Sequence, residues 1–125
     1  MEADEAAGLI RASTSGFLDL EEIRDFRRDM TALVNRVRRR QGHFLLLVDL
    51  RESMVLSLDV MVEVGQQMQW NIDNGMNRSA TLVSSVLQRM QIDRTSERDS
   101  RFRCFLDEAE AEVWLVSEAN VSPPV

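Results

Sequence analysis

The 125-residue chain contains no lysine and no tyrosine, and it has only one cysteine and one histidine. The single Cys104 cannot form a disulfide within the chain, which is typical of proteins in a reducing compartment. The single His43 excludes a metal site built from several histidines. A Ser–His catalytic pair would place His43 at the entry end of a strand, which is the wrong end for a site in an α/β sheet. An enzyme is therefore the least supported class, and we expect no catalytic residues, no metal and no cofactor.

The sequence also lacks a long hydrophobic run, a basic leader and an excess of positive charge. No apolar run approaches the length that spans a bilayer, and residues 1–5 are acidic rather than basic. Residues 43–125 carry thirteen acidic residues against seven arginines, which accounts for the net charge of −6. An acidic protein is a poor binder of nucleic acid. We therefore expect a cytoplasmic protein with no integral membrane association and no nucleic-acid partner.

What the sequence does contain is one stretch without a polar face, Phe44–Val48. A strand that has no polar face must be covered on both sides, as the central strand of a parallel sheet is. Asp49 ends this run, residues 51–56 are expected to form a connection, and Ser57 opens the next helix. In open α/β sheets, ligands and partners usually bind at the carboxyl end of a central strand. We therefore expect any functional site at this turn.

Strand-like and helix-like patterns alternate along the rest of the chain. Helices are expected after the N-cap candidates Asp19, Ser57, Ser84-Ser85 and Asp107, and strands at 8–14, 78–83 and 101–105. Asp19 and Asp107 each begin an Asp-x-x-Glu capping box. With the central strand, this order gives four strand–helix units. It predicts an α/β fold with a mainly parallel sheet of four or five strands flanked by helices. We expect one domain over residues 1–120 and a tail over 121–125.

Three segments match patterns of a known family. They are Gly-Phe-Leu-Asp-Leu-Glu-Glu at Gly16–Glu22, Val-Asp-Leu-Arg at Val48–Arg51, and Phe105–Leu115, where a strand leads into a helix that carries Trp114. In these segments the chain resembles small bacterial proteins of the STAS-like (SpoIIAA-like) family. The resemblance covers nearly the whole chain and implies a superhelix of four β–α units. It also implies a regulatory module that binds another protein rather than an enzyme.

The resemblance directs attention to the start of the helix after the central strand. Anti-sigma-factor antagonists of this fold present a phosphorylatable serine there in Asp-Ser-Ser-Gly, whereas residues 56–60 here read Leu-Ser-Leu-Asp-Val. Only Ser57 lies at a comparable place. It is either a helix N-cap or a phosphorylation site, whose phosphate would sit on the helix N-terminus and pair with Arg51. Asp49, Arg51 and Glu52 form either a polar site or a solvated turn with an Arg–carboxylate pair. We take Asp49, Arg51 and Ser57 as candidate regulatory or partner-binding residues.

The helix that follows Ser57 is apolar around more of its circumference than one sheet contact requires. The stripe expected to face the core consists of Leu58, Met61, Val62, Gly65, Met68 and Ile72. Val60, Val64 and Trp70 lie off that stripe. Such a surplus meets a neighbouring element, a ligand or a second chain, and we expect these three residues to form a homodimer interface. The alternative is that Trp70 folds down beside the sheet.

Two functions follow from these features. The first is a non-enzymatic, regulatory protein–protein interaction module that presents the 51–57 turn and the following helix to a partner or to a second copy. The alternative is a small apolar-ligand or lipid-binding protein with a pocket beside that helix, lined by methionines from the set Met54, Met61, Met68, Met76 and Met90. CRAL-TRIO lipid-transfer domains, which are similar in fold, line such a cavity. An apolar outer helix face would favour the first function, and an internal void the second.

Overall fold

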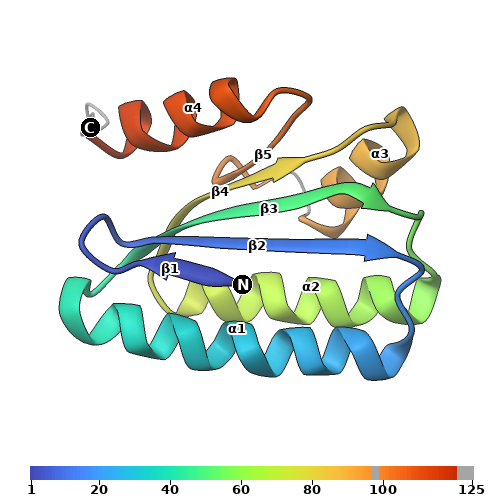
Figure 1. The fold of residues 1–125 in the computed structure, drawn as a ribbon, viewed down its shortest axis with the longest axis horizontal. Helices are drawn as coiled ribbons and strands as arrows, with labels where there is room; N and C mark the ends of the chain where they lie inside the picture. Colours follow the sequence, from blue (N-terminus) through green and yellow to red (C-terminus); the bar gives the residue numbers. More distant parts are fainter. Residues whose placement is uncertain (97–98, 121–125) are drawn as a thin grey trace.

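Five strands form one mixed sheet in the order β1-β2-β3-β4-β5, and four helices flank it (Figure 1). The computed structural model describes residues 1–96 and 99–120, so the tail predicted at 121–125 lies outside the described residues. The elements are β1 (Glu2–Asp4), β2 (Leu9–Gly16), α1 (Leu20–Gln41), β3 (Phe44–Ser53), α2 (Leu58–Asp73), β4 (Met76–Leu82), α3 (Val86–Thr95), β5 (Phe102–Phe105) and α4 (Glu108–Asn120).

The predicted α/β fold with a mainly parallel sheet is confirmed. Strands β2, β3, β4 and β5 are parallel neighbours, and each is followed by a helix, which gives the four strand–helix units. The one antiparallel strand, β1, was not predicted. It has three residues that pair with the start of β2, which is too short a segment to show an alternating pattern. Helices α1 and α2 lie side by side under one face of the sheet, and α4 crosses the other face (Figure 1).

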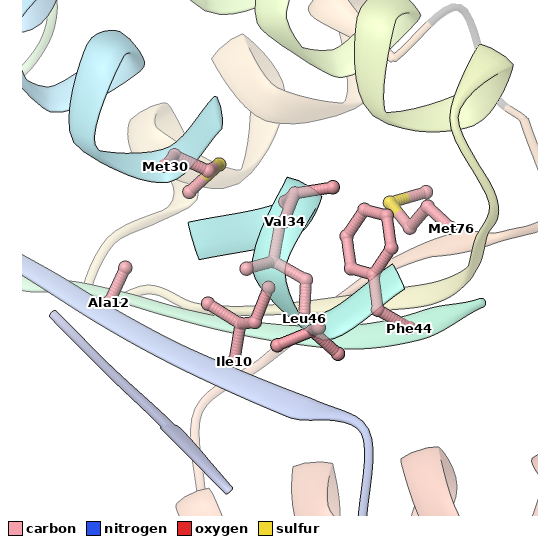
Figure 2. Packing of buried hydrophobic residues seen from close by; sticks show 8 residues of the cluster. Ile10, Ala12, Met30, Val34, Phe44, Leu46 and Met76 are labelled. Carbon is pink, nitrogen blue, oxygen red and sulfur yellow. The ribbon is translucent and has the colours of Figure 1, made fainter. Parts of the chain in front are cut away.

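Strand β3 is the internal strand that its apolar run predicts, with β2 on one side and β4 on the other. Phe44 and Leu46 point into the layer between the sheet and α1, where they pack with Ile10, Met30 and Val34 (Figure 2). The side chains between them point to the opposite face. There Leu45 and Leu47 pack in a second cluster with Leu82 of β4 and with Trp114 and Leu115 of α4. Each face of β3 is therefore covered by a different helical layer.

Local capping signals set the ends of the helices largely as predicted. The Asp19 carboxylate accepts the Glu22 backbone N–H at 2.8 Å, and the Glu22 side chain accepts the Asp19 N–H at 3.4 Å, so the capping box is present. Gly42 ends α1 with a φ of 76°, a conformation that favours glycine. At α4, Asp107 accepts only the Ala109 N–H, at 3.0 Å. It caps the helix without the reciprocal bond that the sequence predicts.

The first prediction concerns the α1 cap. Replacing Asp19 with Ala removes the acceptor for the Glu22 N–H, and the free energy of unfolding should fall by about 1 kcal/mol. Chemical denaturation measures this change. Asp25→Ala is the matched control, because Asp25 pairs only with Arg28 and both side chains are more than half exposed. A control that loses as much stability as Asp19→Ala would contradict the assignment of Asp19 as the cap.

Helix α2 faces the core with a different stripe from the one predicted. Gln67 and Asn71 are buried beside the fully buried Val60, whereas Leu58 and Val62 of the predicted stripe are 80% and 59% exposed. The Gln67 amide donates to the Asn71 side-chain oxygen at 2.9 Å, so these polar groups keep hydrogen bonds inside the protein. The predicted stripe was wrong at Leu58 and Val62, because polarity alone does not decide which side chains are buried, whereas Ile72 packs against the core as predicted.

Of the three residues expected at a dimer interface, Val60 is fully buried, and Val64 and Trp70 are partly buried. Val60 and Val64 belong to a cluster with Leu18 and Ile23, and Trp70 packs against the cluster drawn in Figure 2. The apolar surplus of α2 is therefore met by α1 and the segment before it. The packing of Trp70 agrees with the alternative in which this residue packs against the core. A homodimer at these three residues stays a prediction.

Candidate functional site

The carboxyl end of β3 differs from the predicted turn, because the strand continues to Ser53. Past a register shift, where β3 has one residue more than β2, Ser15 and Gly16 pair with Glu52 and Ser53. The predicted connection at 51–56 therefore shrinks to the four residues before α2. Asp49 and Arg51 are strand residues two positions apart, so both side chains point to the same face of the sheet, the one that α4 covers.

Asp49 and Arg51 form a two-pronged ion pair. The Arg51 Nε donates to Asp49 Oδ1 at 3.0 Å and the Arg51 Nη2 donates to Asp49 Oδ2 at 2.8 Å. The Arg51 backbone N–H also donates to Asp49 Oδ1 at 3.0 Å. This agrees with the interpretation of an Arg–carboxylate pair, although the pair lies on a strand rather than in a turn.

The same geometry recurs beside β5. Arg101 donates its backbone N–H and its Nε to Asp99 Oδ1 at 2.9 Å and 3.0 Å, and its Nη2 donates to Asp99 Oδ2 at 2.7 Å. Both pairs come from the spacing Asp-x-Arg. Because two separate positions show the same arrangement, the Asp49–Arg51 pair is explained by local backbone geometry and does not by itself mark a ligand site.

Neighbouring charges complete a network between the sheet and α4. The Arg51 Nη2 also donates to Glu108 at 3.3 Å, and the Arg11 Nη2 donates to Glu112 at 2.5 Å. The hydrogen bond from Arg51 holds the pKa of Asp49 below its usual range, against a smaller effect of burial. Arg51 thus already has two carboxylate partners. It is not free to receive a phosphate without giving up one of them.

The second prediction is a pH dependence. Because the pKa of Asp49 is lower in the folded protein, the pair stabilises the fold above the unfolded-state pKa of about 3.9, and this contribution is lost as the pH falls through the folded value. Arg51→Gln should raise the pKa of Asp49 toward its usual range, as measured by carboxyl-carbon NMR titration. Arg101→Gln should raise only the pKa of Asp99. An Asp49 titration unchanged by Arg51→Gln would show that the pair does not form in solution.

Ser57 occupies the N-cap position of α2, but its hydroxyl makes no capping hydrogen bond. Ser57 therefore stands at the N-cap position as predicted, but its hydroxyl does not make the hydrogen bond that a capping serine makes. Arg51 is bonded to Asp49 and Glu108 on the α4 face, whereas α2 lies under the opposite face (Figure 1). The structure does not bring Arg51 and Ser57 together as the phosphoserine hypothesis requires.

Helix α3, which follows β4, presents its polar side to the end of β3. The Gln88 Nε2 donates to the Leu50 and Ser53 carbonyls at 2.8 and 2.7 Å, and Gln88 is 95% buried. Gln91 exchanges hydrogen bonds with the backbone of Leu56, receiving its N–H at 3.0 Å and donating to its carbonyl at 2.9 Å. Two glutamines therefore fix α3 to the segment between β3 and α2.

The apolar side of α3 consequently points to solvent, where it adjoins the exposed side of α2. Gln91 reaches the Met61 sulfur at 3.3 Å, and Gly65 and Thr95 approach closely enough that a Cβ on Gly65 would lie 3.3 Å from the Thr95 methyl. Seven of the twelve large exposed hydrophobic residues among the described side chains belong to α2, to α3 or to the segment before α2. They form what we call the α2–α3 apolar face: Met54, Val55, Leu58, Val62, Val86, Leu87 and Met90. Sequence periodicity assigned two members of this face, Leu58 and Val62, to the core.

An internal cavity of about 60 Å³ lies between the sheet and helices α1 and α2. Of the five methionines considered for a pocket, only Met68 lines it, together with Met30 from α1. Pockets for drug-sized ligands measure roughly 300–1,000 Å³, so this space is too small for a lipid. A cavity does lie beside α2, as the alternative function requires. Its size does not support lipid binding, and its lining is not the predicted set of methionines.

Other chemical groups lie apart from this end of the sheet. Within residues 1–96 and 99–120, no three histidine, cysteine or acidic side chains are placed to hold a metal ion. Burial raises the pKa of the half-buried Cys104 thiol to about 11, which keeps it protonated and unreactive at neutral pH. His43 immediately precedes β3, at the amino end of this strand, whereas Asp49 and Arg51 lie toward its carboxyl end. The helices in the described part of the chain are too short or too polar to cross a bilayer.

No family model matches the chain, and no curated protein matches it.

Proposed function

We propose that this protein is a non-enzymatic regulatory module that binds a protein partner through the α2–α3 apolar face. The observation that carries the proposal is the inverted placement of side chains on two adjacent helices. Gln67, Asn71 and Gln88 are buried, while Leu58 and Val86 are 80% and 75% exposed. Single exposed hydrophobic residues are common on monomeric proteins, but seven of them on two helices in contact and on the segment before them favour an interaction surface.

The glutamines make this orientation a stable property of the fold. Turning α3 over to bury Leu87 and Met90 would break the bonds from Gln88 to Leu50 and Ser53 and leave buried carbonyls without donors. Each such loss costs about 1–3 kcal/mol. The helix is therefore held with its apolar side outward, as a binding surface for another protein requires.

We infer that the partner is a different protein rather than a second copy. The three residues expected to form a homodimer are accounted for inside the monomer. Residues 43–125, which contain the whole apolar face, carry six more acidic residues than arginines, and this excess makes two copies repel each other. A partner with an apolar anchor and a basic surround fits this surface better. Membership of the STAS-like family and a cytoplasmic location are parts of the same proposal.

The third prediction tests the face directly. With the purified chain as bait in an extract of the cells that produce it, partners retained by the wild type should be lost on Leu87→Glu. Direct binding of a recovered partner, measured by calorimetry, should weaken at least about tenfold, because anchor residues at interfaces contribute more than about 1.4 kcal/mol. Leu87 is half exposed, so the change should leave the fold intact.

Val113→Glu is the matched control, because Val113 is equally apolar and exposed but lies on α4. It should retain every partner that the wild type retains. Light scattering of the same proteins reports self-association. A dimer that Leu87→Glu dissociates would replace the heterologous partner with a second copy. Partners that bind all three proteins alike would contradict the proposed face.

The fourth prediction concerns regulation at Ser57, which precedes Leu58 of the apolar face. A negative charge at this N-cap position favours the helix, so Ser57→Asp should fold with unchanged or higher stability. If the serine regulates binding, the aspartate should change partner affinity several-fold, while Ser57→Ala behaves as the wild type. Equal affinity of all three proteins would leave Ser57 with a positional role at the helix start only.

A further inference from the structure

Strand β1 pairs with only the first part of the outer side of β2. Its three residues stand opposite Leu9, Ile10 and Arg11, whereas β2 continues to Gly16 (Figure 1). Within the described part of the chain, no strand pairs with this side of β2 beyond Arg11. The second half of β2 is therefore an open edge of the sheet.

The main-chain groups of Ser13 and Ser15 face this open edge. Successive residues of a strand direct their N–H and C=O groups to opposite sides. The carbonyls of Gly8 and Gly16 accept N–H groups from the β3 side at 2.8 and 2.9 Å, so the even-numbered residues of β2 face β3. Ser13 and Ser15 are exposed and odd-numbered, and they present their N–H and C=O groups to solvent. Such an edge can pair with another extended chain.

The open edge lies in a groove that is rich in carboxylates. The groove has a volume of about 630 Å³, runs between the end of β2 and the start of α1, and is lined by both serines and by the apolar Leu18 and Phe26. Five acidic residues and no arginine line it: Glu22, Asp25 and Asp29 of α1, and Asp49 and Glu52 of β3. In the described part of the chain, no three acidic side chains are placed to hold a metal ion. The negative charge is thus spread along the groove and suits a ligand whose positive charges are spread as well.

Two of these carboxylates, Asp29 and Glu52, remain available to a partner. Neither side chain forms an ion pair or a hydrogen bond with another described residue. Elsewhere, arginines pair with Glu5, Glu63 and Glu112 at 2.5 to 2.6 Å. The groove is therefore a place where the protein leaves negative charge without an internal counter-charge, and a basic ligand would be attracted to it.

The groove adjoins the α2–α3 apolar face. The Met54 N–H donates to the Gly16 carbonyl at 2.9 Å, which places a member of this face beside the end of β2. Phe17, the next residue after Gly16, is 57% exposed and adds an apolar side chain at the same junction. A partner anchored on the apolar face can therefore reach the groove.

We propose that the groove binds an extended basic segment of the partner, which adds to β2 as a strand in line with β1. Main-chain hydrogen bonds to Ser13 and Ser15 would hold the segment, and arginine or lysine side chains at alternate positions would lie over the carboxylates of α1. Two copies joined edge to edge do not fit, because the same carboxylates would face each other. This inference names a second contact of the partner proposed above, and it rests on that function.

The fifth prediction uses the synthetic peptide Ac-Arg-Thr-Arg-Thr-Arg-amide as a probe of the full chain labelled with ¹⁵N, at low salt. The peptide should bind along a saturating curve and slow the solvent exchange of the Ser13 and Ser15 amide protons, because an added strand bonds to them. Ac-Arg-Pro-Arg-Pro-Arg-amide has the same charge but lacks N–H donors at its prolines. It should bind more weakly and leave the exchange unchanged. Equal binding of both peptides without slower exchange would reduce the contact to charge attraction and overturn the added strand.

A pair of charge variants tests the place of binding. Asp29→Asn with Glu52→Gln should weaken peptide binding about two- to thirtyfold, as the loss of two surface charge pairs predicts. Asp73→Asn with Glu110→Gln is the matched control, because it removes the same charge from two exposed positions outside the groove. The control should bind as the wild type does. Equal losses in the two variants would overturn the assignment to the groove.

Leu87→Glu separates this inference from the function on which it rests. The variant should bind the peptide as the wild type does, because Leu87 does not line the groove. A partner that requires Leu87, together with a peptide that shows no saturable binding, overturns the groove and leaves the proposed function in place. A peptide bound in the groove, together with partners that bind without regard to Leu87, overturns the proposed function and leaves the groove as a basic-segment site.

Discussion

The structure depends on covering both faces of one apolar strand. In β3, Phe44 and Leu46 point to one side and Leu45 and Leu47 to the other, so neither face can be left to solvent. One face is covered by α1 and α2 and the other by α4, and parallel strands can be joined only by crossovers of this kind. The four strand–helix units follow from that requirement. Because the strands of these units are parallel, their carboxyl ends lie at one end of the sheet, where the candidate sites are found.

The layer under α1 and α2 is not uniform along β3. Toward the amino end of the strand it is filled by large apolar residues such as Phe44 and Met76 (Figure 2). Toward the carboxyl end the buried residues include Ser79, Thr81 and Gln88. Here the usual arrangement is reversed, with polar side chains inside and apolar side chains outside. The cavity and the α2–α3 apolar face are two consequences of this reversal, and both lie at the end of the sheet where α/β proteins bind their ligands and partners.

The charged residues that follow the central apolar run are weaker candidates for a binding site than the exposed hydrophobic residues, because they already have partners. Asp49 and Arg51 draw attention in the sequence because they follow the central strand. In the structure they satisfy each other, and an identical pair at Asp99 and Arg101 shows that the spacing alone produces this geometry. Charged residues that already have partners stabilise their surroundings modestly. The exposed hydrophobic side chains of α2 and α3, by contrast, have no cover within the described part of the chain.

The sequence by itself determined the order and ends of the elements, because those depend on residues only a few positions apart. The Asp19 capping box, the stop at Gly42 and the unbroken run at Phe44–Val48 are all local signals, and all three were predicted correctly. The three-residue strand β1 and the last residues of β3 were missed, because pairing with β2 rather than local pattern makes them strands.

Only the tertiary structure decided which sides of α2 and α3 face inward. A periodic sequence showed two apolar stripes on α2, and hydrophobicity favoured the wrong one. The outcome depends on partners far along the chain, since Gln67 meets Arg27 and Gln88 meets the carbonyl of Leu50. A buried amide is stable only where such partners stand in place, and the sheet and helices must be assembled before they do. For that reason the binding surface and the cavity could not be read from the order of residues alone.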